Sequence, residues 1–137
     1  MSTVIRADIS KKNKYWISKH RYYELKHWCL QYYEWKEMYL YFSGLINRTE
    51  FSDSNSKNSP VEYLAEQREY YKRCMDLLQK CCELSDPCIS TYIFKAVTQG
   101  LSFINLETHG IPCGRDMYYD RYRKFFWILS RKKQSLL

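Results

Sequence analysis

The chain has 137 residues, of which 45% are hydrophobic and 18% aromatic, and its formal net charge at pH 7 is +7. This length allows one domain with a modest core and excludes two independent ones. No stretch approaches the roughly 20 apolar residues that a membrane-spanning helix needs, so we expect a soluble protein without membrane contact.

The positive charge is concentrated at the two ends of the chain. Residues 1–48 contain nine Lys and Arg against four Asp and Glu, or +5. Residues 49–113 contain six against nine, or −3, and residues 114–137 contain seven against two, or +5. If both ends lie on one surface, that surface would attract a polyanion such as nucleic acid.

The composition predicts an all-α protein. Only four glycines and three prolines interrupt long runs of polar and apolar residues, and no run alternates with the two-residue period of a half-buried strand. No signal peptide precedes the six cysteines, so we expect reduced, structural thiols in a cytoplasm. Cys81, Cys82 and Cys88 are close in sequence but form no Cys-x-x-Cys pair, so neither a metal site nor a cofactor is expected.

Residues 1–14 are expected to form a basic arm. Lys11, Lys12 and Lys14 cluster at its end. Such an arm can follow a phosphate backbone or enter a minor groove, and it can equally remain a solvated tail.

Residues 15–45 form an aromatic helical region. With Ser18 as a cap, we expect one helix from about residue 19 to the early thirties and a second, or a continuation, reaching Phe42. Rings interleaved with cations could stack on single-stranded bases, although core and interface packing is the more common role of such rings. If these rings form an interaction surface, its residues are Tyr22, Tyr23, Trp28, Tyr32, Trp35 and Tyr39.

Residues 46–59 have the composition of a flexible linker, and residues 60–85 that of one long helix. Ser59 is a suitable cap and Pro60 suits the first helical position. Apolar residues recur along this helix at three- and four-residue spacings, and they include Val61, Leu64, Tyr71, Met75 and Leu78. The seam could pack within the chain or form a homodimer, and its interruption by Arg68 favours the first.

Residues 86–133 are predicted to form a helix-turn-helix unit with helices at 87–99, 102–109 and 114–131. Asp86 and Ser102 are suitable caps for the first two helices, and Gly100 and Gly110 suit their ends. Ile111-Pro112 forces an extended connection between the second and third helices. This is the element order of a helix-turn-helix DNA-binding unit.

The third helix would place an apolar seam inward and cations outward. Tyr118, Tyr122, Phe125, Phe126 and Leu129 recur on one side. A helix presented N-terminus first to the major groove of double-stranded DNA would bring Arg115, Tyr118 and Tyr119 to the base edges. The remaining predicted DNA-binding residues, which lie on the outer side or would meet phosphates, are Arg121, Arg123, Lys124, Arg131, Lys132 and Lys133.

Two observations weigh against this interpretation. In the common form of the motif, the first apolar residue of the second helix comes six positions after the turn glycine. Asp116 occupies that position here. A helix, a glycine and a second helix also occur in helical hairpins that touch no nucleic acid, where terminal basic residues complement the helix dipole.

Catalysis is not expected. The histidines are scattered, and no carboxylate pair, serine elbow or glycine-rich phosphate loop accompanies them. A nucleophilic tyrosine would need an arginine and histidine constellation, usually on a larger fold. We therefore predict a protein that is not an enzyme.

Two segments carry a resemblance to a known family, IFKAVTQGLSFINLETHGIPCGRDMYYDRYRKFFWILSRK at residues 93–132 and KYWISKHRYYELKHWCLQYYEWK at residues 14–36. They resemble small helix-turn-helix proteins of phages and prophages of Gram-positive bacteria, in the manner of RinA-like and ArpU-like late transcriptional regulators. The resemblance implies a DNA-binding regulator of phage genes in the host cytoplasm, with Arg115, Tyr118, Tyr119 and Arg123 on the recognition helix. The long aromatic N-terminal region departs from a minimal regulator of this kind.

Two functions follow as hypotheses. The first is a phage-encoded, DNA-binding transcriptional regulator that uses the C-terminal helix-turn-helix. The second is a protein-interaction module that inhibits a host nucleic-acid machine, either RNA polymerase or a defence nuclease such as a CRISPR effector, and it is motivated by the aromatic surface of residues 15–42.

Overall fold

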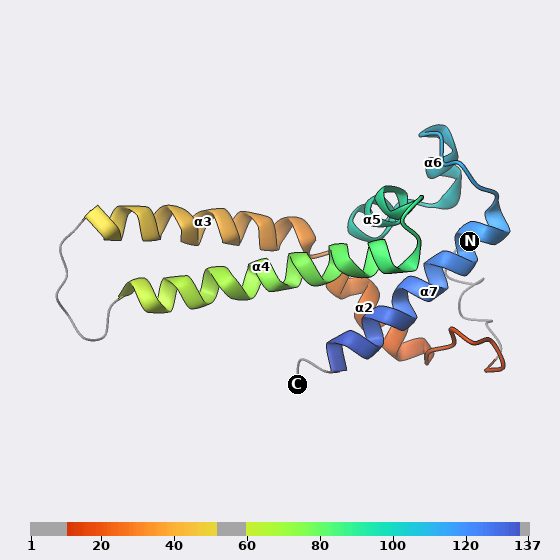
Figure 1. The fold of residues 1–137 in the computed structure, drawn as a ribbon, viewed down its shortest axis with the longest axis horizontal. Coiled ribbons are helices and arrows are strands. Elements are labelled where there is room, and N and C mark those ends of the chain that lie inside the picture. The colour runs from red at the N-terminus through yellow and green to blue at the C-terminus, as the bar shows by residue number, and fades with distance from the viewer. Residues whose placement is uncertain (1–10, 52–59, 135–137) are drawn as a thin grey trace. The chain divides into compact units, whose positions relative to one another are not determined.

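The computed structural model describes residues 11–51 and 60–134, apart from the side chains of 49–51. Within these residues the chain is all-helical and has no strand, as predicted. The helices are α2 (Lys19–Cys29), α3 (Tyr32–Phe51), α4 (Pro60–Ser85), α5 (Ser90–Gln99), α6 (Phe103–Thr108) and α7 (Arg115–Gln134) (Figure 1). They fall into two compact units: unit 1 comprises residues 1–30 and 78–137, and unit 2 comprises residues 31–77.

Side-chain caps begin two helices of unit 1 where the sequence predicts them. The Ser18 hydroxyl accepts a hydrogen bond from the backbone N–H of Arg21 at 3.3 Å and so caps α2. Ser102 and Asn105 form a reciprocal capping box at the start of α6. These bonds satisfy backbone N–H groups that the first turn of a helix leaves without partners.

Two glycines end helices, also as predicted. Gly100 follows α5 with φ of 71° and Gly110 follows α6 with φ of 85°, a backbone conformation that side chains with a Cβ rarely adopt. The start of α5 differs from the prediction, because the helix begins at Ser90 rather than residue 87. Asp86 Oδ1 accepts a hydrogen bond from the backbone N–H of Cys88 at 2.8 Å, so this residue closes the turn that precedes the helix.

The core of unit 1 forms where α7 lies across α2 (Figure 1). Tyr22 is central to this contact: its ring packs edge to face with that of Phe126, with centroids 4.9 Å apart, and its hydroxyl lies 2.6 Å from the hydroxyl of Tyr122. Burial of each large apolar side chain here contributes roughly 1.5–3 kcal/mol. Other fully buried members are Leu25, Cys29, Leu78, Cys81, Ile89, Ile93, Leu106, Phe125 and Leu129.

Unit 2 contains α3 and the first 18 residues of α4, which run side by side as a helical hairpin (Figure 1). The ring of Phe42 on α3 stacks on Tyr71 of α4, with centroids 6.1 Å apart and planes 14° apart. The long helix at 60–85 is thus present as predicted, and its apolar seam contacts the same chain. Leu78 is fully buried within the chain and cannot meet a partner, whereas Tyr71 is half-buried, so a homodimer through the other seam residues stays a prediction.

Two expected segments meet the limits of the described residues. Helix α3 continues to Phe51, so the first six residues of the expected linker at 46–59 are helical. Residues 52–59, with the expected cap at Ser59, lie outside the described residues, as do residues 1–10 of the expected arm.

The six cysteines are all free thiols, and four are buried: Cys29, Cys74, Cys81 and Cys82. Burial raises the pKa of Cys81 to about 12 and that of Cys29 well above its usual value, so both stay protonated at neutral pH. In the described part of the chain, no three His, Cys, Asp or Glu side chains are grouped to hold a metal ion. None of the described helices has the length and apolar character that crossing a membrane requires.

Candidate nucleic-acid interface

The N-terminal half of α7 does not present its tyrosines to solvent. Tyr118 is 1% exposed and Tyr119 is 8% exposed. Phe103 of α6 covers both, with ring centroids 5.3 Å from Tyr118 and 6.3 Å from Tyr119. The prediction that these two tyrosines meet base edges is therefore wrong. The apolar face of α7 is wider than the predicted apolar seam, and it includes Tyr119.

Arg115 is the one predicted base-contacting residue that reaches the surface. Its guanidinium lies 5.4 Å from the centre of the Phe103 ring. The exposed residues that follow it are Asp116 and Met117, the latter 43% exposed. An acidic and an apolar side chain in the first turn make this end of α7 a poor match for a phosphate backbone.

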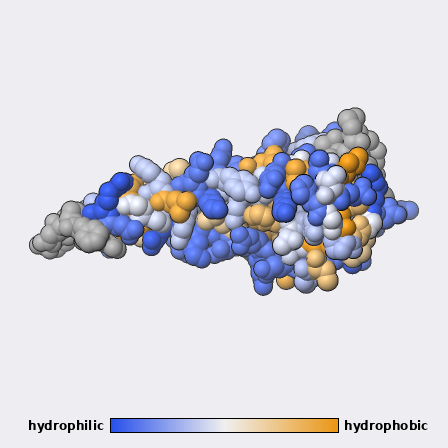
Figure 2. All heavy atoms as spheres, turned by 90° about the horizontal axis from the view of Figure 1, so that it is seen from above, coloured by the Kyte–Doolittle hydropathy of each residue, from blue (hydrophilic) through white to orange (hydrophobic). Residues whose placement is uncertain are grey.

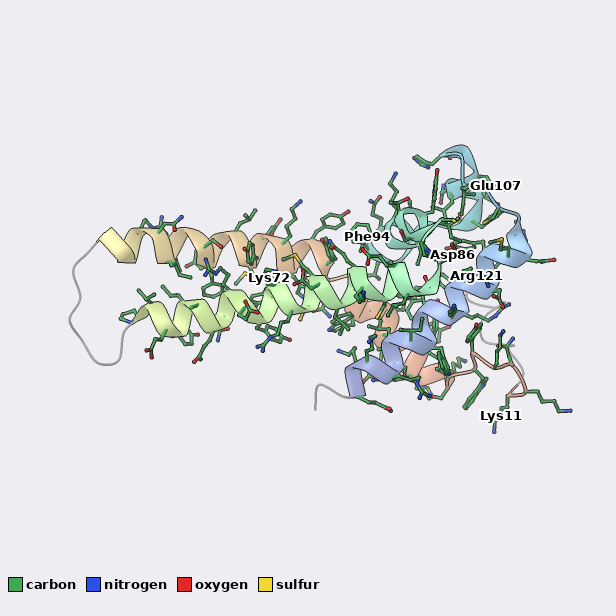
Figure 3. The ribbon with its side chains drawn as sticks, in the orientation of Figure 1. Lys11, Lys72, Asp86, Phe94, Glu107 and Arg121 are labelled. Atoms are coloured by element: carbon green, nitrogen blue, oxygen red, sulfur yellow. The ribbon has the colours of Figure 1, made fainter. Side chains whose placement is uncertain are left out.

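Arg121 is half-buried and pairs with carboxylates of the same chain. Its Nε donates a hydrogen bond to Asp86 Oδ2 at 3.0 Å, its Nη1 pairs with Asp120, and Figure 3 shows Asp86 and Arg121 together. Partial burial acts to raise the pKa of Asp86, but hydrogen bonds from Arg121 and from the backbone of Cys88 and Ile89 outweigh it, and the pKa is lowered. This pairing disfavours the predicted contact of Arg121 with a phosphate, since the guanidinium would have to give up two carboxylates.

The remaining predicted cations of α7 differ in exposure. Arg131 is exposed, whereas Arg123, Lys124, Lys132 and Lys133 are half-buried. The Nε of Arg123 is buried without a hydrogen-bond partner among the described residues, and Lys133 Nζ lies 4.2 Å from the centre of the Trp28 ring. Arg115 and Arg131 are separated by about 24 Å along the helix. The exposed cations among the predicted DNA-binding residues, Arg115 and Arg131, therefore lie near opposite ends of α7.

The aromatic region does not form the surface that was expected of it. Tyr22, Tyr32 and Trp35 are 1%, 7% and 3% exposed, so assigning them to an interaction surface is wrong. Tyr23, Trp28 and Tyr39 are half-buried. The buried rings pack in the core, which is the more common role of large aromatic side chains.

The segment before α2 forms an ordered turn against α7. Asn13 holds the turn by accepting hydrogen bonds from the backbone N–H groups of Tyr15 at 2.8 Å and Trp16 at 3.0 Å. The rings of Tyr15 and Trp127 pack in an edge-to-face arrangement, with their centroids 5.7 Å apart. The cations of this segment remain exposed, and Lys11 points away from the ribbon in Figure 3.

A stripe on the C-terminal half of α7 continues this surface. Lys124, Trp127 and Arg131 follow one another at three- and four-residue steps and therefore share one side of the helix. The guanidinium of Arg131 lies 4.7 Å from the centre of the Trp127 ring. We name the resulting surface the basic–aromatic face, which consists of Lys11, Lys14, Lys124 and Arg131 with the rings of Tyr15, Trp16 and Trp127.

A second contact fixes α2 to the same part of α7. Arg21 Nε donates to the hydroxyl of Ser130 at 3.0 Å, and Nη2 donates to its carbonyl at 3.1 Å. These residues are 109 positions apart in the chain. Both positively charged ends of the sequence thus contribute to a single unit.

The three rings of the basic–aromatic face were not among the residues predicted from the sequence to bind DNA. A signal was present in the positions of Lys124 and Arg131, which flank Trp127 at helical spacing. The contact between Tyr15 and Trp127 has no local signal, because it joins distant parts of the chain. Comparisons of this chain with models of protein families, with curated proteins and with solved structures find no match.

Proposed function

We propose that this protein binds DNA through the phosphate backbone, using the basic–aromatic face. The observation that carries the proposal is the contact between Tyr15 and Trp127, which packs the basic segment before α2 against α7 at a position between Lys124 and Arg131. Clustered Lys and Arg side chains release counterions from DNA when they meet phosphates, and this release favours binding.

The charges of the face support this role. Lys11, Lys14 and Arg131 are exposed, and within the described part of the chain each lies over an aromatic ring rather than beside a carboxylate. Arg121, by contrast, already meets two carboxylates. Only cations without such partners gain much from contact with a phosphate, since a paired cation must first give up its carboxylate.

The proposal moves the DNA contact away from the predicted recognition helix terminus. Three helices, α5 to α7, occupy the segment predicted to form a helix-turn-helix unit, and Arg115 at the exposed start of α7 stays a proposed contact. Regulation of phage transcription rests on the sequence resemblance and is proposed on that basis alone.

A charge-matched pair of variants tests the proposal. The first combines Lys11→Gln, Lys14→Gln and Arg131→Gln, and the second combines Lys36→Gln, Arg48→Gln and Arg73→Gln, which are exposed cations of unit 2. Fluorescence anisotropy with a labelled 20-base-pair duplex, and with one of its strands, is measured across salt concentrations.

The first variant should bind more weakly, and its salt slope should fall by roughly 0.9 for each duplex phosphate that the substituted side chains no longer neutralise. The unit 2 variant, with the same net charge, should keep the wild-type slope. Equal losses of affinity in both variants would show that net charge alone drives binding and would contradict the proposed face.

One observation favours a second candidate, a protein-interaction module. On unit 2, Leu40 is 59% exposed, Tyr41 56% and Tyr63 60%, and Figure 2 shows hydrophobic residues reaching the surface of the hairpin. Exposed apolar side chains of this size often mark sites of protein contact. Gel filtration with nuclease-treated, purified host RNA polymerase tests this candidate: co-elution that Leu40→Glu abolishes would support it, and separate elution would contradict it for that enzyme.

A further inference from the structure

We propose that the basic–aromatic face selects unpaired nucleic acid, with Trp16 and Trp127 stacking on bases while the cations that cover them bind phosphates. This inference rests on the proposed function and adds the form of the ligand. Single-stranded DNA and single-stranded RNA share the required chemistry, namely a base with an accessible ring face and an adjacent phosphate.

Each of the two tryptophans lies beneath a cation of the same face. Lys11 Nζ is 5.9 Å from the centre of the Trp16 ring, and the guanidinium of Arg131 is 4.7 Å from that of Trp127. A cation over an exposed ring is held weakly, more weakly than a stacked base. A nucleotide offers both groups a better partner, because the ring gains a base and the cation gains a phosphate.

The two tryptophans reach the surface, and contacts hold the backbone of Trp16 and the ring of Trp127. Trp16 is 36% exposed and its backbone N–H is fixed by the turn at Asn13. Trp127 is half-buried, and its place on α7 and the contact with Tyr15 fix its orientation. A ring that is fixed before binding loses little conformational freedom when a base stacks on it.

The face lacks the features that read a duplex. In double-stranded DNA the ring faces of the bases are stacked on one another, and only their edges can be reached, by an element that enters a groove. The element expected to do so is the start of α7, where Tyr118 and Tyr119 are buried and Asp116 is exposed. Lysine ammonium groups and tryptophan ring faces, which the basic–aromatic face does offer, match a flexible strand with unstacked bases.

Binding of the full-length chain to three labelled probes tests the inference. The probes are a 20-nucleotide oligo(dT), a 20-nucleotide oligo(U) and a 20-base-pair DNA duplex, and the readouts are anisotropy and quenching of tryptophan fluorescence. The variants are Trp16→Leu and Trp127→Leu. Tyr41→Leu, an aromatic residue of unit 2 that is 56% exposed, is the matched control.

The wild type should bind the single strands more tightly than the duplex, with tryptophan quenching. Each tryptophan variant should lose about five- to ten-fold in affinity for single strands, with little change on the duplex, and the control should bind as the wild type does. Tighter binding of either single strand than of the duplex supports the inference, and the ratio of oligo(dT) to oligo(U) affinity ranks the DNA strand against the RNA strand.

Tighter binding to the duplex, or equal losses of affinity on all three probes, would overturn the inference while leaving DNA binding intact. Failure to bind any probe at low salt would instead contradict the proposed function. Circular-dichroism melting shows whether a variant that binds weakly is still folded. Because Trp16 lies outside the helices, Trp16→Leu keeps the test valid if Trp127→Leu unfolds.

Discussion

Asp86 connects three parts of unit 1 through a single carboxylate. It follows α4, its Oδ2 accepts from Arg121 of α7, and its Oδ1 accepts from the backbone of Cys88 just before α5. Its side chain is 10% exposed, whereas that of Arg121 is 32% exposed. Water therefore screens the pair only in part, and the hydrogen bonds to the charged carboxylate stabilise the fold.

The lowered pKa of Asp86 predicts an acid-dependent loss of stability. A carboxyl group whose pKa is lower in the folded state stabilises the fold above its unfolded value of about 3.9. This contribution disappears as the pH falls below that value and through the folded pKa. Asp86→Asn should lower the free energy of unfolding by about 2 kcal/mol at pH 7 and flatten its decline between about pH 5 and pH 2.

Asp76→Asn is the matched control, because Asp76 forms an exposed pair with Lys72 on α4. Its expected cost is below about 0.5 kcal/mol, which is typical of exposed helical pairs. Urea unfolding followed by circular dichroism at several pH values measures both variants. Similar losses of unfolding free energy for Asp86→Asn and Asp76→Asn would contradict the stabilising role of Asp86 in unit 1.

The environments of the thiols predict a single fast-reacting cysteine. Cys88 is exposed, whereas burial raises the pKa of Cys81 to about 12 and that of Cys29 well above its usual value. Alkylation proceeds through the thiolate, so iodoacetamide at pH 7.5 should modify Cys88 first and leave the buried thiols intact. Peptide mass spectrometry over time gives the order, and early modification of Cys29 or Cys81 would contradict the packing of unit 1.

Helix α7 combines a buried apolar side with an outer side whose charge changes along its length. Its buried side carries Tyr118, Tyr119 and Phe125, and its outer side changes from Asp116 near the start to Arg131 near the end. The basic end therefore complements the negative partial charge of the helix C-terminus as well as forming part of the basic–aromatic face.

The turn between α6 and α7 depends on one glycine conformation. Gly110 has φ of 85°, and an added Cβ there would meet no other atom, so the only cost of Gly110→Ala is backbone strain. We expect this substitution to lower stability by about 1 kcal/mol. Gly114→Ala is the control, because Gly114 lies in the same connection without a positive φ and its Cβ would also meet open space.

Thermal melting of the two alanine variants measures this difference. Gly110→Ala should melt several degrees lower than the wild type, and Gly114→Ala close to it. Equal melting temperatures would contradict the left-handed turn at Gly110, and with it the geometry that directs α7 after α6.

For the chain as a whole, the positions of the helices could be predicted from the sequence. Which helix faces are buried could be predicted only in part. Ser102 and Gly110 bracket α6 because caps and positive-φ glycines act within a few residues. The burial of Tyr119 was not predictable, because it depends on Phe103 of another helix and tyrosine suits both core and surface. The pairing of Arg121 with Asp86, 35 positions apart, likewise has no local signal.

The candidate site depends on contacts between still more distant residues. The charge pattern indicated two basic ends but not whether they meet, and within unit 1 they meet through Tyr15 on Trp127 and Arg21 on Ser130. Among the cations expected to bind DNA, Lys124 and Arg131 therefore stay predicted contacts as members of the proposed face. Arg121 is left out of the proposed face, because it already pairs with Asp86 and Asp120 of the same chain.

The most direct test of the basic–aromatic face is a lysine footprint. It compares acetylation of each lysine in the full-length protein with and without a 20-nucleotide single strand. When the strand is bound, we expect Lys11, Lys14 and Lys124 to lose reactivity together, while Lys36, Lys72 and Lys95 keep theirs. Protection at only one end of the chain, or protection centred on Lys36 and Lys72, would contradict a nucleic-acid-binding face built from both ends.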